Sequence, residues 1–436
     1  HVDVISMSLG GYGTPDDPMA IAVDNAVDAG VIAVIAAGNS GPYDQTIGSP
    51  GTSRKAITIG ASTRLDQMAY FSSRGPIING DELLIKPDVT APGVLICAAQ
   101  WDSAWNSSRC YQDVPNHIAI SGTSMATPHV AGVAALLKQA HPTWTPEIIK
   151  SAIMLTAKDM GYDPFIQGSG RVDAFQAYNS SISVDKPSLS FNNVQNNVTV
   201  TEFTIKNLRD YAIFLTLNST NASKKNDNLS YNVLSLNTSS VLLNPGESKS
   251  ITAVLTLPSV TGLSSGTISI NENGRLYRMP YAFITLSRIK LKAISSGKIL
   301  SPTFLVADES LKNAYAANSG FHFDGDELTF AVEPGDYVVY AVGDNSDPEL
   351  EYILMNKIAV PPLSTVNLVL STKNARQFKV NTHSKSGKPL LLETYLKDVI
   401  LTTAAGYIYY SGGYYGFLFY SPDRTVYISD IADDSK

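Results

Sequence analysis

The chain has 436 residues, of which 44% are hydrophobic and 16% charged, with a formal net charge of −7. This length suffices for about two to four domains with buried cores, which excludes a disordered chain, a coiled coil or a mini-protein. An acidic balance without a run of Lys or Arg argues against nucleic-acid binding as the main role. The apolar runs are short, so the sequence predicts no membrane span.

The sequence begins at His1 without Met or a targeting segment, and we interpret it as part of a longer precursor. Seven Asn-X-Ser/Thr sequons occur, six of them within Asn179–Ser239: Asn106, Asn179, Asn197, Asn218, Asn221, Asn228 and Asn237. The cluster favours an exported protein, extracellular or at the cell surface, that carries N-linked glycans.

Predicted strands and helices alternate in the first 178 residues. Val31–Ala37 is apolar on both sides, as in a central strand of a parallel sheet covered by helices. Ala126–Gln139 is rich in Ala and Gly, and we expect this helix to be buried on all sides. Thr145-Pro146-Glu147 has the residues of a helix start. The other predicted elements are Val4–Ser8, Pro18–Ala29, Ala56–Ile59 and Val94–Ala98.

The pattern changes to β after Asn179. Short alternating segments separated by turn residues predict a β-sandwich over residues 179–286, with strands at Thr199–Ile205, Tyr211–Leu217, Ser250–Leu257, Thr267–Ile270 and Tyr277–Phe283. Residues 287–436 form a second predicted β-rich domain, a further sandwich. Its clearest strands are Leu328–Val332, Tyr337–Val342, Val366–Leu370 and Tyr407–Tyr410, and Gly406–Tyr420 is interpreted as a Tyr-rich hairpin.

The chemistry of the chain centres on Gly122–Gly132, which reads GTSMATPHVAG. Ser124 directly precedes an apolar helix, where unpaired N–H groups and the helix dipole favour negative charge. That position suits a nucleophile whose attack creates an oxyanion, although an isolated Ser there is more often a helix cap. The complete eleven-residue block resembles the active-serine signature of the subtilisin-like serine proteases.

Four further blocks resemble the same family in the same order: Asp3–Gly11, Ala36–Gly41, Phe71–Pro76 and Lys86–Val94. The last two are similar to its pyrolysin-like and plant-type multidomain members. The resemblance covers roughly residues 1–176 and implies an α/β fold, incomplete at its N-terminus. It implies Ser124 as nucleophile and the Asn39 amide with the Ser124 N–H as oxyanion donors. It also implies a substrate cleft lined by Ser8, Leu9, Gly10, Ala36, Ala37 and Gly38.

A nucleophilic Ser needs a base, and the base needs an orienting acid. In this family both lie upstream of the first block found here, and no His-Gly-Thr motif occurs in the chain. Asp28-Ala29-Gly30 superficially resembles a catalytic Asp motif, but its place before a strand indicates a helix end. We therefore expect a separate N-terminal segment of the same precursor to supply Asp and His. The alternative is a non-catalytic relative, a structural or binding protein of a cell surface or appendage.

Cys97 and Cys110 flank a segment that looks inserted relative to a minimal subtilase, and export favours a disulfide between them. Trp101 and Trp105 in this segment either wall the substrate cleft or cover the protease body. The family often binds calcium, and Asp16, Asp17, Asp44, Asp81 and Glu82 are loop acids of a suitable type. None has a spacing that specifies a site, so no metal residue is assigned, and hydrolysis itself requires no cofactor.

The segment from Asn179 resembles the fibronectin-III-like domain that follows the protease domain in cell-envelope subtilases. Such a domain holds substrate, braces the protease or acts as a spacer, and the sequence does not choose among these roles. Taken together, the sequence predicts a secreted or cell-surface serine endopeptidase that acts on polypeptides. Proteins of the cell surface are further candidate partners.

Overall fold

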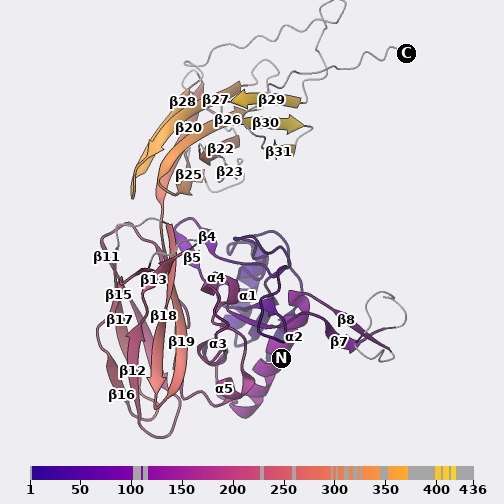
Figure 1. Ribbon diagram of the computed structural model, residues 1–436, viewed down its shortest axis with the longest axis vertical. Helices are drawn as coiled ribbons and strands as arrows, with labels where there is room; N and C mark the ends of the chain where they lie inside the picture. Colours follow the sequence, from indigo (N-terminus) through magenta and orange to yellow (C-terminus); the bar gives the residue numbers. More distant parts are fainter. Residues whose placement is uncertain are drawn as a thin grey trace, which may run out of the picture. The chain divides into compact units, whose positions relative to one another are not determined.

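The computed structural model describes the chain in two compact units, His1–Leu286 and Ser287–Lys436 (Figure 1). The described residues are 2–101, 110, 116–225, 230–257, 262–295, 298–300, 303–308, 314–317, 323–324, 327–343, 352–371, 398–403, 406–411 and 414–418.

A four-stranded parallel sheet in the order β1-β2-β3-β6 forms the centre of the α/β part. All five residues of β2 are buried, as its uninterrupted apolar sequence predicts. Two short antiparallel hairpins, β4–β5 and β7–β8, accompany the sheet. The strands are β1 (Val4–Met7), β2 (Ile32–Ala36), β3 (Ile57–Ser62), β4 (Ile77–Asn79), β5 (Glu82–Leu84), β6 (Val89–Pro92), β7 (Ile96–Ala99) and β8 (His117–Ile120).

Helices cover both faces of this sheet. Ile32 and Val34 of β2 pack with α2 and α3, while Ala33 and Ile35 pack with α1, because successive residues of a strand point to opposite faces. Asp17 caps α1, and the Thr145 hydroxyl accepts a hydrogen bond from the Ile148 N–H at the start of α3. The helices are α1 (Pro18–Asp28), α2 (Thr123–Ala140), α3 (Pro146–Leu155), α4 (Pro164–Gln167) and α5 (Ala174–Tyr178).

The expectation that Ala126–Gln139 is buried on all sides is wrong for the described residues. One face of α2 packs on the sheet, but the opposite face is exposed along a stripe made of Pro128, His129, Gly132, Ala135, Leu136 and Gln139. Leu136 keeps 60% of its accessible surface. No described element covers this stripe, which is why an apolar composition does not lead to full burial here.

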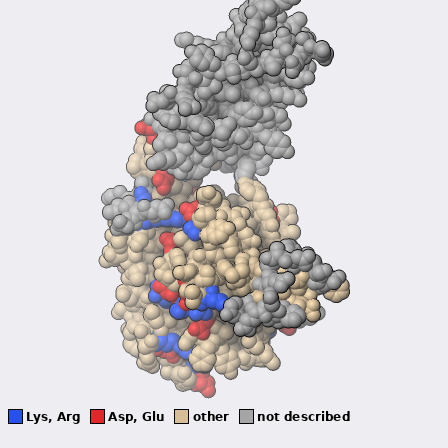
Figure 2. Space-filling model, turned by 45° about the vertical axis from the view of Figure 1, so that its right-hand side comes forward, with Lys and Arg blue, Asp and Glu red and all other residues tan. Residues whose placement is uncertain are grey.

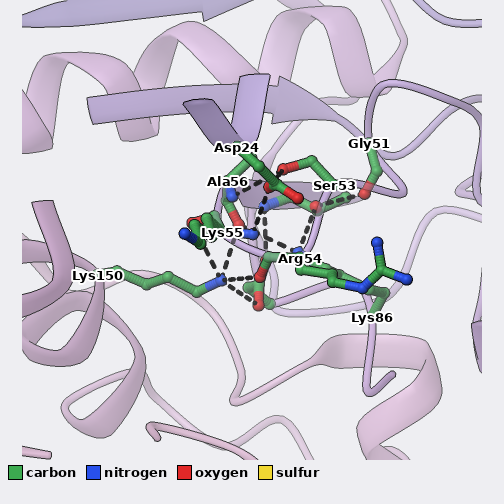
Figure 3. A network of polar contacts seen from close by, with 10 residues as sticks. Asp24, Gly51, Ser53, Arg54, Lys55, Ala56, Lys86 and Lys150 are labelled. Carbon is green, nitrogen blue, oxygen red and sulfur yellow. Dashed lines mark hydrogen bonds and ion pairs between the residues drawn. The ribbon is translucent and has the colours of Figure 1, made fainter. Parts of the chain in front are cut away.

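A buried ion-pair network joins β3, the residues directly before β6, and α3 (Figure 3). The Lys86 ammonium donates to the Ala56 carbonyl, the Thr58 hydroxyl and the Asp88 carboxylate, and it is fully enclosed. Lys150 binds the other oxygen of Asp88 at 3.1 Å. Burial lowers the pKa of Lys86 to about 8 although Asp88 opposes the shift. Burial would raise the pKa of Asp88, but Lys150 and Lys86 together lower it.

This network predicts a rise in stability at alkaline pH. Unfolded Lys86 releases its proton near its ordinary value of 10.5 and folded Lys86 near 8, so the unfolded chain binds more protons between these values. The free energy of unfolding should therefore increase from pH 8 to pH 10.5, by on the order of 3 kcal/mol. Denaturant titrations across this range measure it. Lys86→Met, which leaves the Asp88–Lys150 pair in place, should abolish the increase; an equal rise in that variant would contradict the assignment.

Two sheets follow α5 and enclose one core. One has the path β10-β19-β18-β12-β16 with β13 and β14 beside it, and the other has the order β15-β17-β11-β9. Buried and exposed residues alternate along β12 and β17, as in a two-sheet sandwich. The strands are β9 (Ile182–Val184), β10 (Leu189–Asn193), β11 (Val198–Asn207), β12 (Ile213–Ser219), β13 (Ala222–Lys224), β14 (Ser230–Tyr231), β15 (Leu234–Leu236), β16 (Ser240–Leu243), β17 (Ser248–Thr256), β18 (Gly262–Glu272) and β19 (Arg275–Thr285).

The α/β part and this sandwich are packed together as one unit. Leu155 at the end of α3 is buried within the apolar core of the sandwich. The Val184 N–H donates to the Ser151 hydroxyl at 2.7 Å, and Arg278 pairs with Asp159 at 2.7 Å. The sandwich is therefore not an independently placed domain but part of the same compact unit as the α/β part.

The second unit is also built from strands. A sheet containing β21-β20-β25-β24, with β28 beside β20, shares an apolar core with the sheet β23-β22-β26-β27. A third sheet contains β29-β30-β31, and β30 and β31 form the predicted Tyr-rich hairpin. The strands are β20 (Ser287–Ser295), β21 (Lys298–Leu300), β22 (Thr303–Asp308), β23 (Ala314–Ala317), β24 (Phe323–Asp324), β25 (Glu327–Val332), β26 (Gly335–Gly343), β27 (Tyr352–Val360), β28 (Thr365–Ser371), β29 (Asp398–Thr403), β30 (Gly406–Ser411) and β31 (Tyr414–Leu418).

On the face shown in Figure 2, Lys and Arg are interspersed with Asp and Glu, and much of the surface is uncharged. Among the residues that the structure describes, no helix is long and apolar enough to cross a membrane.

Candidate active site

Ser124 is the second residue of α2, in the turn where backbone N–H groups lack intrahelical acceptors. Gly122 occupies the cap position and offers no side chain to bind them. The Ser124 side chain is partly exposed, and its hydroxyl lies 3.5 Å from the Ser8 carbonyl, a long contact that leaves it weakly held. The Ser124 hydroxyl, with one long hydrogen-bond contact, therefore lies at the N-terminus of α2, the positive end of the helix dipole.

Asn39 supplies the cap that Gly122 cannot. Its side-chain oxygen accepts hydrogen bonds from the N–H and the hydroxyl of Thr123, at 2.9 and 3.0 Å. Because both neighbours are donors, the amide oxygen must face Thr123 and the NH₂ group must face away from it. The NH₂ group lies next to Gly122 and donates no hydrogen bond to any described residue. The amide and the first turn of α2 thus present free donors beside Ser124.

Backbone geometry fixes Asn39 in this position. Gly38 has φ +107°, and a Cβ at that residue would come within 2.8 Å of the Ser73 hydroxyl, so only glycine fits. The Gly38 N–H donates to the Thr123 hydroxyl, and the Ser40 N–H donates to the Ser73 hydroxyl. The residues on both sides of Asn39 are therefore tied to neighbouring elements.

The residues expected to line a substrate cleft come from two segments that converge. Ser8, Leu9 and Gly10 form an exposed stretch after β1, and the Ser8 hydroxyl donates to the Ser124 carbonyl. Ala36 and Ala37 are buried, and the Ala37 N–H and carbonyl are bonded to the Ile59 carbonyl and the Gly48 N–H, so neither residue is open to a ligand. Gly11 exchanges two backbone hydrogen bonds with Ser49, which closes the first segment onto the loop that follows Asn39.

Two open hollows meet at Ser124, with cavity volumes of about 460 and 390 Å³. The first lies against the β7–β8 hairpin and includes Ala98, Ile118 and His129. The second includes Asn39 and Gly122. The site thus provides a largely apolar depression on either side of the hydroxyl.

No imidazole among the described residues is hydrogen-bonded to Ser124. His129 lines the first hollow, but its Nδ1 contacts the Met125 carbonyl at 2.8 Å. His141 is stacked on Trp144 and binds the Tyr178 carbonyl. Asp28 is the last residue of α1 and pairs with Lys55, which confirms that Asp28-Ala29-Gly30 is a helix end.

A disulfide joins Cys97 of β7 to Cys110, as predicted. Trp101 is 88% exposed, and Trp105 lies outside the described residues. Of the sequon residues, Asn106 and Asn228 also lie outside them. Asn179 is partly buried and its amide donates to the Phe175 carbonyl, whereas the remaining four are exposed: Asn197, Asn218, Asn221 and Asn237.

The loop acids considered for calcium all have protein partners. Asp16 and Glu82 bind Arg54 and hold its pKa above the ordinary value, and Asp17 caps α1. Asp44 pairs with Lys225, and Asp81 accepts a hydrogen bond from Asn193. Within the described ranges, His, Cys, Asp and Glu nowhere form a group of three or more suited to a metal ion.

The family model described as "Subtilase family" matches residues 1–170, the segment that contains Asn39 and Ser124. Residues 1–170 are therefore similar to the subtilase family. Serine protease AprX of Bacillus subtilis is 43% identical to the chain over 191 residues, which are 40% of this chain and 42% of that protein.

Pyrolysin of Pyrococcus furiosus is 37% identical over 224 residues (40% of this chain, 15% of that protein), and a subtilisin of Bacillus pumilus is 38% identical over 175 residues (40% and 55%). The match therefore spans at most about half the length of these three relatives. Residues 1–170, called the subtilase domain from here on, are thus similar to serine proteases of the subtilisin type.

Sequence reasoning missed two residues of the site. Thr123 orients the Asn39 amide through its hydroxyl. Its position directly before Ser124 in the signature could have identified it as a residue of the site. Ser49 joins the two segments of the cleft through its backbone. No local pattern marks a backbone pairing of this kind.

The Thr123 contacts predict a specific loss of stability in Thr123→Val. Valine keeps the shape but removes the hydroxyl, so the partly buried Gly38 N–H loses its acceptor and Asn39 loses a donor, at a cost of about 1–3 kcal/mol. Chemical denaturation measures the change in the free energy of unfolding. Thr127→Val is the matched control, because the Thr127 hydroxyl donates only to a carbonyl within α2. Equal losses in the two variants would contradict the role given to Thr123.

Proposed function

We propose that the subtilase domain is the catalytic part of a subtilisin-like serine endopeptidase with Ser124 as nucleophile. The observation that carries this proposal is the placement of a weakly held hydroxyl at the N-terminus of α2, beside the free NH₂ group of Asn39. The Ser124 N–H and the Asn39 NH₂ group would donate to the oxyanion, and each such donor typically lowers the barrier by about 2.7–4 kcal/mol.

In this reaction the Ser124 oxygen bonds to the carbonyl carbon of a peptide, and its proton passes to a base. Collapse of the tetrahedral intermediate breaks the C–N bond, and the base returns the proton to the leaving amine. Water then releases the acyl group by the reverse proton path. No cofactor takes part in these steps, and no calcium ligand is assigned.

The base and its orienting acid belong, in this proposal, to an N-terminal segment of the same precursor. Two surfaces near Ser124 support this. β1 lies at the edge of the parallel sheet with β2 as its only described strand partner, which leaves backbone groups open to a further strand. The stripe of α2 that includes Gly132, Ala135 and Leu136 is exposed on the same helix that carries Ser124 in its first turn. A segment that covers both would lie within reach of the hydroxyl.

The substrate is proposed to be an extended polypeptide that pairs with the backbone of Ser8–Gly10 and lies beside the segment Ala36–Gly38. Small residues in both segments leave room for a bulky side chain, so we expect a broad, apolar-leaning preference. The exposed Ser8–Gly10 stretch supports this arrangement. Gly38 lines the cleft without pairing, because its N–H binds the Thr123 hydroxyl and its carbonyl accepts from the Ser73 N–H.

We further propose the domain boundaries 1–178, 179–286 and 287–436. The middle domain is proposed to be fibronectin-III-like, which its two-sheet core supports.

We also propose an extracellular or cell-surface location, with proteins of that surface as partners, and the exposure of the sequons in the middle domain supports this location. The names of the relatives AprX, pyrolysin and subtilisin state no location, so the proposed location rests on the sequons and the disulfide.

Covalent labelling of the native full-length protein with a fluorophosphonate probe tests the proposed function. The adduct should map to Ser124, and Ser124→Ala should lose both label and peptide hydrolysis. That variant should unfold at the same denaturant concentration, because the Ser124 hydroxyl makes only a 3.5 Å contact. Ser235→Ala in the sandwich is the control and should keep the label. Folded, uninhibited wild-type protein that takes no label would instead favour the non-catalytic structural or binding protein.

The glycan proposal is tested by peptide mass spectrometry of native material. Exposed Asn197, Asn218 and Asn237 should carry N-linked glycans. Asn179 should be modified least, because its amide nitrogen already donates a hydrogen bond and is partly buried. Unmodified asparagine at all three exposed positions would count against export by a glycosylating route.

A further inference from the structure

An ion pair connects the sandwich to the loop that follows Asn39. Lys225, directly after β13, lies with its ammonium nitrogen 2.6 Å from the Asp44 carboxylate. The Lys225 side chain is only 11% exposed, and its nitrogen is buried without an aligned hydrogen bond. The described residues offer it no carboxylate other than Asp44 within ion-pair distance. Because a buried ammonium is costly without a counter-ion, Lys225 depends on Asp44 for its charge balance.

The position of Lys225 is fixed by the sandwich and not by the loop. Its N–H donates to the Leu263 carbonyl of β18, and β13 pairs with β18 just before it. The Lys225 nitrogen also lies 5.5 Å from the centre of the buried Phe165 ring in α4. α4 is held in turn by Asp163, whose carboxylate accepts hydrogen bonds from the Phe165 N–H and the Ser265 hydroxyl. These contacts fix the position of Lys225, and its ammonium group can therefore hold Asp44 and the loop that contains it.

The loop of residues 40–48 connects the two halves of the candidate site. It starts directly after Asn39 and ends at Ser49, which pairs with Gly11. The Gly41 N–H and the Thr46 N–H bind the Phe71 and Arg74 carbonyls on its inner side. Tyr43 and Asp44 lie between these anchors and are exposed. Among the described residues, the Asp44–Lys225 pair is the ion pair that connects this loop to the sandwich.

We propose that Lys225 and Asp44 are positioning residues for peptide hydrolysis: through this pair the sandwich holds the loop of residues 40–48, and with it the spacing between Asn39 and the Ser8–Gly11 segment. This inference rests on the proposed function and deepens it, because it gives the middle domain a role in substrate binding. The pair touches no reacting atom, so its effect is on the shape of the substrate cleft. The bracing role of the middle domain is thereby preferred to a spacer role.

The test uses the full-length protein with Lys225→Met, which keeps the side-chain stem over Phe165 and removes the charge. We expect hydrogen exchange of residues 40–48 to become about tenfold faster and KM for a peptide substrate to rise about threefold to tenfold with kcat within about twofold. Asp44→Asn, a change at an exposed loop residue, should give the same result and guards against misfolding of the first variant. The charge exchange Asp44→Lys with Lys225→Glu should restore both readouts.

Arg278→Met is the matched control. Arg278 forms an ion pair across the same junction with Asp159, which is not part of the loop of residues 40–48. This variant should lower the unfolding temperature without changing KM or the exchange of residues 40–48. Unchanged exchange in both Lys225→Met and Asp44→Asn, or a KM effect equally large in Arg278→Met, would overturn the proposal. An inactive wild-type protein that still shows the exchange difference would contradict the proposed function alone.

Discussion

The hydrogen bonds between the Asn39 amide oxygen and Thr123 determine how the candidate site is arranged. They cap a helix that begins with a glycine, and they do so from a loop at the end of a buried strand. The same contact turns the Asn39 NH₂ group away from Thr123 and leaves the Ser124 N–H free. One interaction therefore serves both stability and chemistry. The parallel sheet contributes by placing the end of β2 and the start of α2 at a common edge.

The sandwich behaves as an extension of the α/β core. α3 contributes Leu155 to the apolar interior of the sandwich and Ser151 as an acceptor for β9. The ion pairs of Arg278 and Lys225 lie at other points of the same junction. Contacts spread over α3, α4 and the loop after Asn39 fix the sandwich in several directions, so it is well placed to restrain the cleft.

Local sequence signals predicted much of the α/β part because the relevant interactions are themselves local. The unbroken apolar run of β2, the Thr145 cap and the signature around Ser124 each appear within a few neighbouring residues. The exposed stripe of α2 was not predictable, since alanine and glycine are compatible with burial and do not reveal whether a neighbour is present. The Asp44–Lys225 pair joins residues far apart in the chain, and either alone resembles an ordinary surface charge.

The same limitation of local signals applies to the calcium-type acids and the cleft residues. Asp16 and Glu82 look like free loop carboxylates in the sequence, yet both are engaged by Arg54. Ala36 and Ala37 have the small side chains expected of a cleft wall, but both residues are buried, and the backbone N–H and carbonyl of Ala37 are bonded within the protein. Burial and partner choice depend on the assembled tertiary structure, which composition and spacing do not encode.

The burial of Leu155 in the sandwich core has a consequence for how such proteins diversify. A gene rearrangement that joined this α/β domain to an unrelated C-terminal domain would expose Leu155 and leave the Ser151 hydroxyl without the Val184 N–H. The two domains are therefore expected to be inherited as a pair, with compensating changes on both sides of the junction. Recombination would be tolerated better after Leu286, where one compact unit ends and the next begins.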